Sequence, residues 1–267
     1  MTSLNQTVDT LLRRALAKTE PLSRQELEGI LHLMGKWRHQ MISNTIKMRD
    51  GLVVQGGPFA GMQLAPYSAE GCFAPKLLGC YEQALHPHLE KFIARGFDAV
   101  LNIGCAEGYY AIGLAQRMPN TRIFAYDLNE GAQETCRAMA DINGVTERLI
   151  IGGLFSGEDF ERFAALDTLV MVDIEGAEEA LLDPEAFQAL QLMTVIVECH
   201  GGPARGTIET LTARFQTTHR LIRVDQTYSQ PRLPTWLRDL GHMDQLLAIW
   251  EWRGEPTPWL VMEPRRA

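Results

Sequence analysis

The chain has 267 residues, of which 46% are hydrophobic and 22% are charged, and its formal net charge is −8. This length and apolar content predict a globular protein with a sizeable core, and the acidic balance argues against nucleic-acid or anionic-membrane partners. The five cysteines form no CxxC pair, and the beginning of the chain lacks the apolar core of a signal peptide. We therefore expect a cytoplasmic protein without a disulfide framework, a zinc cluster or a membrane span.

The first 70 residues predict a helical extension that ends in a short hairpin. Apolar residues recur at helical spacing over 4–18 and 24–45. Ser23 followed by Glu26 is typical of a capping box at the start of the second helix. The stretch DGLVVQGGPFAGMQLAP then predicts two short strands around a Gly-Gly-Pro turn. The apolar stripes of the two helices also suggest a homodimer as a hypothesis.

Residues 71–267 predict a second domain, which begins with a helix over 74–95 that is broken near Pro87. We then expect strands at 98–103, 122–127, 148–152, 168–173, 193–198, 219–225 and 257–263, with helices at about 108–118, 130–142, 158–165, 177–190 and 206–216. This alternation predicts an α/β fold with a doubly wound, mostly parallel, seven-stranded sheet. Residues 226–256 interrupt the alternation with prolines and aromatic residues, so we interpret them as an insertion over the carboxyl edge of the sheet.

The loop after the first strand of this sheet, GCAEG at 104–108, is a candidate ligand site. Parallel sheets bind ligands beyond the carboxyl ends of their strands, and glycines let the backbone approach a ligand closely. A dinucleotide loop would carry glycine in place of Ala106, and the carboxylate of Glu107 would repel a pyrophosphate but attract a cation. Asp127 ends the next strand, where an acid binds a ribose diol. S-adenosylmethionine satisfies both requirements, and a nicotinamide cofactor is the less favoured alternative.

Two further segments carry a resemblance to a known family. Residues 98–130 resemble motif I and the following acidic position of class I S-adenosylmethionine-dependent methyltransferases. The stretch TLVMVDIEGAEEALLD, 168–183, resembles the D-[IV]-E-G-A-E signature of the FkbM-like methyltransferases, and VIVECH, 195–200, resembles the strand that follows it. The resemblance covers about residues 97–216 and implies a Rossmann-like fold with S-adenosylmethionine as cofactor.

The resemblance also implies which residues bind the cofactor. The expected positions are Gly104, Ala106, Glu107 and Gly108 around the methionine part; Asp127, Leu128, Gly153 and Leu154 at the ribose and adenine; and Tyr81, Glu82 and Asp173 closing over the cofactor. The alternative for Tyr81 is a purely structural role in the hydrophobic core.

Three polar residues, Asp173, Glu198 and His200, lie at or just beyond the ends of the fourth and fifth strands. Methyl transfer needs the acceptor held in line with the methyl group, and a hydroxyl acceptor must also lose its proton. In one hypothesis His200 is the general base, with Asp173 or Glu198 orienting or charging it. In the other, all three bind a divalent cation such as Mg²⁺, which lowers the pKa of the hydroxyl. Helix capping by Asp173 and loop shaping by His200 are the structural alternatives.

We therefore expect a methyltransferase that acts on a small molecule, with a hydroxyl on a sugar or secondary metabolite as the acceptor implied by the resemblance. N-methylation of a small amine or peptide is the nearest alternative, followed by a nicotinamide-dependent oxidoreductase. A protein that binds the cofactor without turning it over is a third class.

Overall fold

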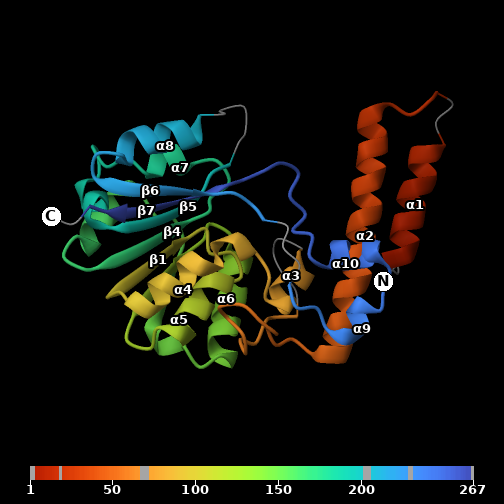
Figure 1. Ribbon diagram of the computed structural model, residues 1–267, viewed down its shortest axis with the longest axis horizontal. Helices are drawn as coiled ribbons and strands as arrows, with labels where there is room; N and C mark the ends of the chain where they lie inside the picture. Colours follow the sequence, from red (N-terminus) through yellow and green to blue (C-terminus); the bar gives the residue numbers. More distant parts are fainter. Residues whose placement is uncertain (1–3, 18–19, 67–71, 201–205, 228–230, 266–267) are drawn as a thin grey trace.

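The computed structural model describes residues 4–17, 20–66, 72–200, 206–227 and 231–265. Their centre is a seven-stranded sheet in the order β3-β2-β1-β4-β5-β7-β6 (Figure 1). Its strands are β1 (Ala99–Ile103), β2 (Arg122–Tyr126), β3 (Leu149–Gly152), β4 (Thr168–Val172), β5 (Thr194–Glu198), β6 (His219–Val224) and β7 (Trp259–Pro264). The predicted doubly wound, mostly parallel, seven-stranded sheet with an N-terminal helical extension is confirmed.

The direction of β7 determines which residues meet at the carboxyl edge of the sheet. β1 pairs in parallel with β2 and β4, and β4 pairs in parallel with β5. β7 instead runs antiparallel between β5 and β6, so its first residue, Trp259, lies opposite Glu198 and Val224. All residues of β1, β4 and β5 are buried, as their continuous apolar sequences predict.

Helices cover both faces of the sheet (Figure 1). One face carries α4 (His86–Arg95), α5 (Tyr109–Arg117) and α6 (Glu130–Ile142), and the other carries α7 (Glu178–Leu181) and α8 (Thr207–Phe215). Short 3₁₀ helices complete the connections: η1 (Gln83–Leu85), η2 (Thr146–Arg148), η3 (Gly157–Phe163) and η4 (Gln188–Leu192).

The helix expected at 177–190 is not formed as a single element. It ends after four residues as α7, and the chain turns before η4 begins. Pro184 cannot donate a backbone hydrogen bond, and the preceding Asp183 carboxylate accepts from the N–H groups of Glu185 and Ala186. The prediction of one helix over 177–190 is therefore wrong, because the turn at Asp183 and Pro184 interrupts the helical spacing of the apolar residues.

The N-terminal extension consists of α1 (Leu4–Leu16) and α2 (Arg24–Asp50), and α3 (Phe73–Leu78) follows it. Ser23 and Glu26 form the expected capping box. The hairpin expected at 50–66 is reduced to an isolated antiparallel bridge between Val53 and Gln63. The helix expected at 74–95 is divided into α3, η1 and α4.

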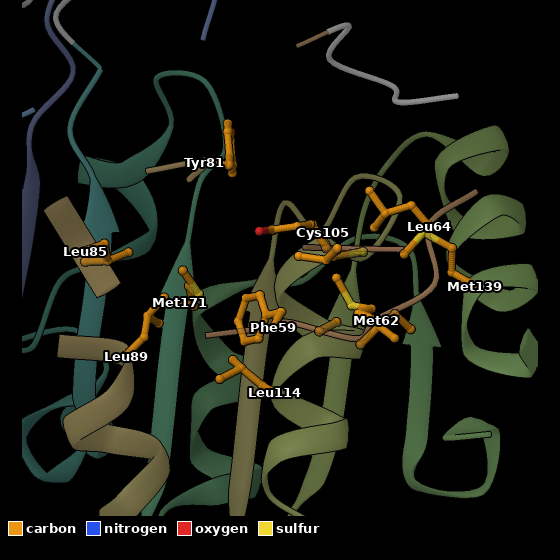
Figure 2. Packing of buried hydrophobic residues seen from close by; sticks show 14 of the residues in the cluster. Phe59, Met62, Leu64, Tyr81, Leu85, Leu89, Cys105, Leu114, Met139 and Met171 are labelled. Atoms are coloured by element: carbon orange, nitrogen blue, oxygen red, sulfur yellow. The ribbon is translucent and has the colours of Figure 1, made fainter. Parts of the chain in front are cut away.

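The segment between α2 and α3 packs into the main core. Figure 2 shows Phe59, Met62 and Leu64 beside Leu114 of α5 and Met139 of α6. A side chain at Gly113 would overlap the Phe59 ring, so this contact requires the glycine. Buried residues between Ile42 and Ala65 therefore share one hydrophobic cluster with the sheet.

The insertion, residues 226–256, packs against α2 of the N-terminal extension. It contains α9 (Thr235–Arg238) and α10 (His242–Ala248), which lie beside α2 in Figure 1. Arg38 forms two hydrogen bonds with Asp244, at 2.6 and 2.7 Å. The His39 Nδ1 atom lies 2.8 Å from the Leu247 carbonyl oxygen. Among the described residues, no helix has the length and hydropathy to cross a membrane.

Candidate active site

The loop between β1 and α5 makes a tight turn against the end of β4. Gly104 and Gly108 have φ angles of 79° and 92°, in the left-handed region. A Cβ atom at Gly104 would overlap the carbonyl oxygen of Asp173, and one at Gly108 would lie 2.6 Å from the Cys136 sulfur. Both glycines are thus required by packing: Gly104 lets the loop lie close to Asp173, and Gly108 lets it lie close to Cys136 of α6.

Asp127, at the end of β2, ties this loop to the neighbouring strand. Its Oδ2 atom accepts a hydrogen bond from the Ala106 N–H, and its Oδ1 atom accepts one from the Asn129 N–H, both at 2.8 Å. Ala106 has a φ of 45°, which is unfavourable for a residue with a Cβ atom, and the bond to Asp127 stabilises that conformation. The carboxylate is half-buried and stands at the expected ribose position.

The side chain of Glu107 forms a buried ion pair that the sequence did not reveal. Its Oε1 atom lies 2.7 Å from the Nζ atom of Lys76 on α3, and the two side chains are 4% and 2% exposed. Glu107 is therefore not an isolated negative charge at the crevice, as the sequence suggested. The loop instead presents one positive and one negative group side by side. The position of Lys76 within the apolar run FAPKLL was the signal that was missed.

A cavity of about 20 Å³ lies over the loop and is lined by Lys76, Tyr81, Glu107 and Asp173. Asn102 of β1 also lines it; this side chain is buried, and its Oδ1 atom accepts no hydrogen bond from the described residues. A buried carbonyl oxygen without a donor is unfavourable unless a ligand or water supplies one. Asn102 was not singled out from the sequence, although a polar residue inside the buried run AVLNI is unusual.

Two leucines are exposed beyond the neighbouring ends of β2 and β3. Leu128 and Leu154 are each 74% exposed. Tyr126 and Gly152 pair in the sheet, so each leucine stands two residues beyond this pair, at the same edge. Gly153, which directly precedes Leu154, is half-buried. These are the positions expected to contact adenine, and the structure leaves apolar surface there.

The structure separates the three residues predicted to act together in catalysis. The His200 Nε2 atom lies 3.5 Å from Asp173 Oδ1. Glu198 instead contacts Arg253 and accepts a hydrogen bond from Thr257. The reversed direction of β7 explains this, because it brings the end of the insertion next to Glu198. Glu198 is therefore bound to Arg253 and Thr257 and acts on His200 through its charge, which helps to raise the pKa of the imidazole.

Two other acids take part in the group around His200. Its Nδ1 atom lies 2.8 Å from Glu178 Oε1, and its Nε2 atom lies 3.5 Å from Glu175 Oε2. Ligand atoms of Asp173, Glu175 and His200 all lie within 4.8 Å of one another. Asp173 is not a helix cap, because α7 has Ala177 at its N-cap position.

The Glu178–His200 contact affects the ionisation of both groups. Burial disfavours the protonated imidazole, but the hydrogen bond to Glu178 and the nearby negative charges outweigh it and raise the pKa of His200. Burial also opposes the Glu178 carboxylate, but the His200 bond and the Gly176 N–H outweigh it and lower the pKa of Glu178. The pair therefore fixes the orientation of the imidazole ring.

A second charged network surrounds Arg253, in the insertion. Arg253 contacts the carboxylates of Glu82 and Glu198, and its Nε atom lies 3.1 Å from Glu251 Oε2. Glu82 also accepts a hydrogen bond from the Tyr110 hydroxyl. Burial and the neighbouring Glu198 charge raise the pKa of Glu82 well above its usual range, although Arg253 opposes the shift.

Tyr81 and Glu82 were expected together on a helix over the cofactor. They lie instead in the turn between α3 and η1 and line different spaces. Tyr81 lines the small cavity over the loop, whereas Glu82 lines a larger neighbouring cavity. Arg253 and Glu251 were not predicted, because the insertion carries no motif that identifies them.

No protein-family model matches the chain. A stretch of 73 residues is 36% identical to the release factor glutamine methyltransferase of Chlorobaculum tepidum. The match spans 26% of this chain and 25% of that curated relative, so it covers only about a quarter of the relative's length.

The chain is also similar in structure to two solved proteins. One is the O-methyltransferase from Bacillus cereus in complex with SAH, with 10% identity over 98% of this chain and 100% of that chain and a TM-score of 0.46. The other is the O-methyltransferase TomG from Streptomyces achromogenes, involved in tomaymycin synthesis, in complex with SAM. It shows 13% identity over 99% of each chain and a TM-score of 0.46. The mostly parallel seven-stranded sheet agrees with the Rossmann-like fold that the resemblance to class I methyltransferases implies.

Proposed function

We propose that the protein is an S-adenosylmethionine-dependent methyltransferase that methylates a hydroxyl group of a small molecule, a sugar or secondary metabolite. One observation carries this proposal. The Gly104–Gly108 loop is bound to Asp127, and its Glu107 side chain forms a buried ion pair with Lys76. This arrangement offers a carboxylate for a ribose and two opposite charges for an amino-acid group.

The residues present fit the cofactor at each of its parts. Lys76 suits the carboxylate of the methionine part, while Glu107 and the Asn102 Oδ1 atom suit its ammonium. Asp127 suits the ribose hydroxyls, and the exposed Leu128 and Leu154 suit the adenine. The loop carries Ala106 where a dinucleotide-binding loop has its middle glycine, which disfavours a dinucleotide.

When bound, S-adenosylmethionine supplies a methyl group on a sulfonium, which the acceptor oxygen takes as its proton leaves. In the proposed mechanism His200 receives that proton at Nε2, next to Asp173, which lines the small cavity. Glu178 acts as a positioning residue, because its contact with Nδ1 directs Nε2 toward Asp173. Glu198 contacts Arg253, and its charge also favours the protonated form of His200.

A divalent cation is the alternative to His200 as base. Asp173, Glu175 and His200 offer two carboxylates and one imidazole within 4.8 Å. Glu178 would then be the carboxylate that orients a ligating histidine, a common arrangement around metals. The two carboxylates suit cations such as Mg²⁺ or Mn²⁺, whereas the imidazole is a donor that suits Zn²⁺, Fe²⁺ or Ni²⁺.

We also propose a subfamily, a location, a domain boundary and an oligomeric state for the protein. Membership of the FkbM-like subfamily rests on the stretches DIEGAE and VIVECH. The cytoplasmic location rests on the cysteine pattern, and the division at residue 70 rests on the change of sequence pattern there. A homodimer through α1 and α2 is supported by the exposed Leu11, Leu16, Leu27 and Leu31. If light scattering gives the mass of a monomer, the proposed homodimer is wrong.

Calorimetric titration of the purified chain with S-adenosylhomocysteine and with NAD⁺ tests the proposed function. We expect binding of the nucleoside and no binding of NAD⁺, and we expect Asp127→Asn to weaken the nucleoside at least tenfold. Asp141→Asn is the matched control, because Asp141 is an exposed acid on α6. Binding of NAD⁺ with no heat from S-adenosylhomocysteine would overturn the proposal.

A further inference from the structure

A cavity of about 630 Å³ lies beside the small cavity over the loop. It is bounded by α2, the turn that contains Glu82, the end of β6 and the insertion. This volume is typical of a site for a small organic molecule. Trp259, the first residue of β7, lines both cavities, so this one residue stands in the wall of each.

The wall of the large cavity is mainly apolar. Its larger apolar side chains include Leu31, Leu85, Val224, Leu247, Trp250 and Trp259. The Trp250 ring packs against Gly35 of α2, where an added Cβ atom would lie 3.0 Å from the ring. The N-terminal extension and the insertion thus build this wall together. Such a surface favours a molecule with an aromatic or aliphatic body.

Acidic side chains outnumber Lys and Arg side chains in the wall of the large cavity. Glu82, Glu251 and Glu255 line the cavity, and Arg253 is the one Lys or Arg side chain among the described residues that does so. Arg253 is already in contact with Glu198 and Glu251, and these two carboxylates more than neutralise its charge without a contribution from Glu82. The cavity therefore repels an anion and attracts a cation.

We propose that this cavity is the acceptor site, and that the acceptor is an aromatic or aliphatic molecule that carries a protonated amine. This inference rests on the proposed function and narrows its substrate class. The ammonium lies on the side of Glu251 and Glu255, where it also faces the Trp250 ring. The methyl-accepting hydroxyl points toward Trp259, beyond which Asp173 lines the small cavity.

Three phenols with the same ring and different charges test the inference: tyramine, tyrosol and 4-hydroxyphenylacetate. Each is titrated calorimetrically into the full chain, both alone and saturated with S-adenosylhomocysteine. We expect tyramine to bind at least tenfold more tightly than neutral tyrosol, and the anion to bind most weakly. Equal affinities, or a preference for the anion, would overturn the inference.

Variants locate the preference in the cavity. Glu255→Gln should reduce the tyramine preference about threefold without affecting folding, because Glu255 is exposed. Glu251→Gln should reduce it further, although this residue also contacts Arg253 and the Glu82 backbone. Glu185→Gln, on an exposed residue outside the cavity, is the matched control and should change nothing. A preference that both cavity variants leave intact would place tyramine elsewhere and overturn the inference.

The same titrations distinguish failure of the inference from failure of the proposed function. Binding of S-adenosylhomocysteine without any amine preference removes the inference and leaves the proposed function standing. An amine preference without S-adenosylhomocysteine binding removes the role of the cavity as an acceptor site together with the proposed function.

Discussion

The ammonium of Lys76 lies 2.7 Å from the carboxylate of Glu107, and both side chains are almost completely buried. A buried ion pair contributes little to stability, because desolvation of the two charges offsets most of their attraction. This pair lies on the glycine loop at the carboxyl edge of the sheet, where parallel sheets bind ligands. Its position therefore favours recognition of a ligand with two opposite charges.

The first prediction concerns Lys76. Lys76→Met should weaken S-adenosylmethionine binding about 10- to 100-fold, the effect of losing a charge-assisted hydrogen bond. Decarboxylated S-adenosylmethionine, which has no carboxylate for Lys76 to bind, should lose much less affinity. Calorimetry with both ligands measures the difference, and Lys91→Met, at an exposed ion pair, is the control.

Because Lys76→Met leaves the Glu107 charge buried, the double variant Lys76→Met with Glu107→Gln separates binding from folding. Equal losses for the two ligands in a well-folded double variant would contradict carboxylate recognition by Lys76.

The second prediction concerns the exposed leucines beyond β2 and β3. Leu128→Ser and Leu154→Ser should each weaken the nucleoside about 3- to 10-fold, because each removes apolar area that adenine would cover. Neither should change the melting temperature, since both side chains are exposed. Leu192→Ser, at another exposed leucine, is the control. An unchanged affinity in both variants would place adenine elsewhere.

The third prediction concerns His200. His200→Gln should lower kcat by about 10²- to 10⁴-fold if the imidazole is the base, with an unchanged dissociation constant for S-adenosylmethionine. Glu178→Gln should lower kcat less, because it frees the ring but keeps the base. Single-turnover rates and cofactor titrations of the same samples check both points. A matching loss of cofactor affinity would point to a structural role.

The fourth prediction separates a base from a bound cation. We expect dialysis against EDTA to leave kcat unchanged, and Glu175→Gln to have near wild-type activity, because the Glu175 side chain is 85% exposed. Loss of activity after EDTA, restored by Mn²⁺ in the wild type but not in Glu175→Gln, would instead establish the cation site.

The fifth prediction is a pH dependence of stability that arises at His39. Burial lowers the pKa of His39 to about 4, although its bond to the Leu247 carbonyl opposes the shift. The unfolded chain therefore binds a proton below about pH 6.5 that the folded chain resists, so stability is lost as the pH falls from 6.5 through 4. The loss should reach about 3 kcal/mol.

Urea unfolding at pH 7.5 and pH 4.5 measures this loss. The replacement His39→Gln should reduce the difference between the two pH values, because glutamine does not titrate. His242→Gln, at an exposed histidine, should leave it unchanged. An identical pH dependence in wild type and His39→Gln would assign the effect to other groups.

The sheet and the Gly104–Gly108 loop were predictable because their determinants are local. Continuous apolar runs identify β1, β4 and β5, and a strand followed by glycines identifies the loop. Asp127 follows from its position at the end of the next strand.

The rest of the site depends on contacts between distant segments. Lys76 meets Glu107 because α3 packs over the loop, and Arg253 meets Glu198 because β7 is reversed. No spacing rule in the sequence connects these residues. The same limit explains Glu198, whose place at a strand end was predicted correctly but whose partner came from the insertion.

Tyr81 and Glu82 are neighbours in the chain and stand in the walls of the two adjoining cavities. The smaller space measures only about 20 Å³, so a nucleoside can enter it only if side chains of its wall, such as Tyr81, are displaced. That displacement also shifts Glu82 and its ties to Tyr110 and Arg253. Steady-state kinetics should therefore be sequential and ordered, with the methyl donor adding first and the spent donor leaving last.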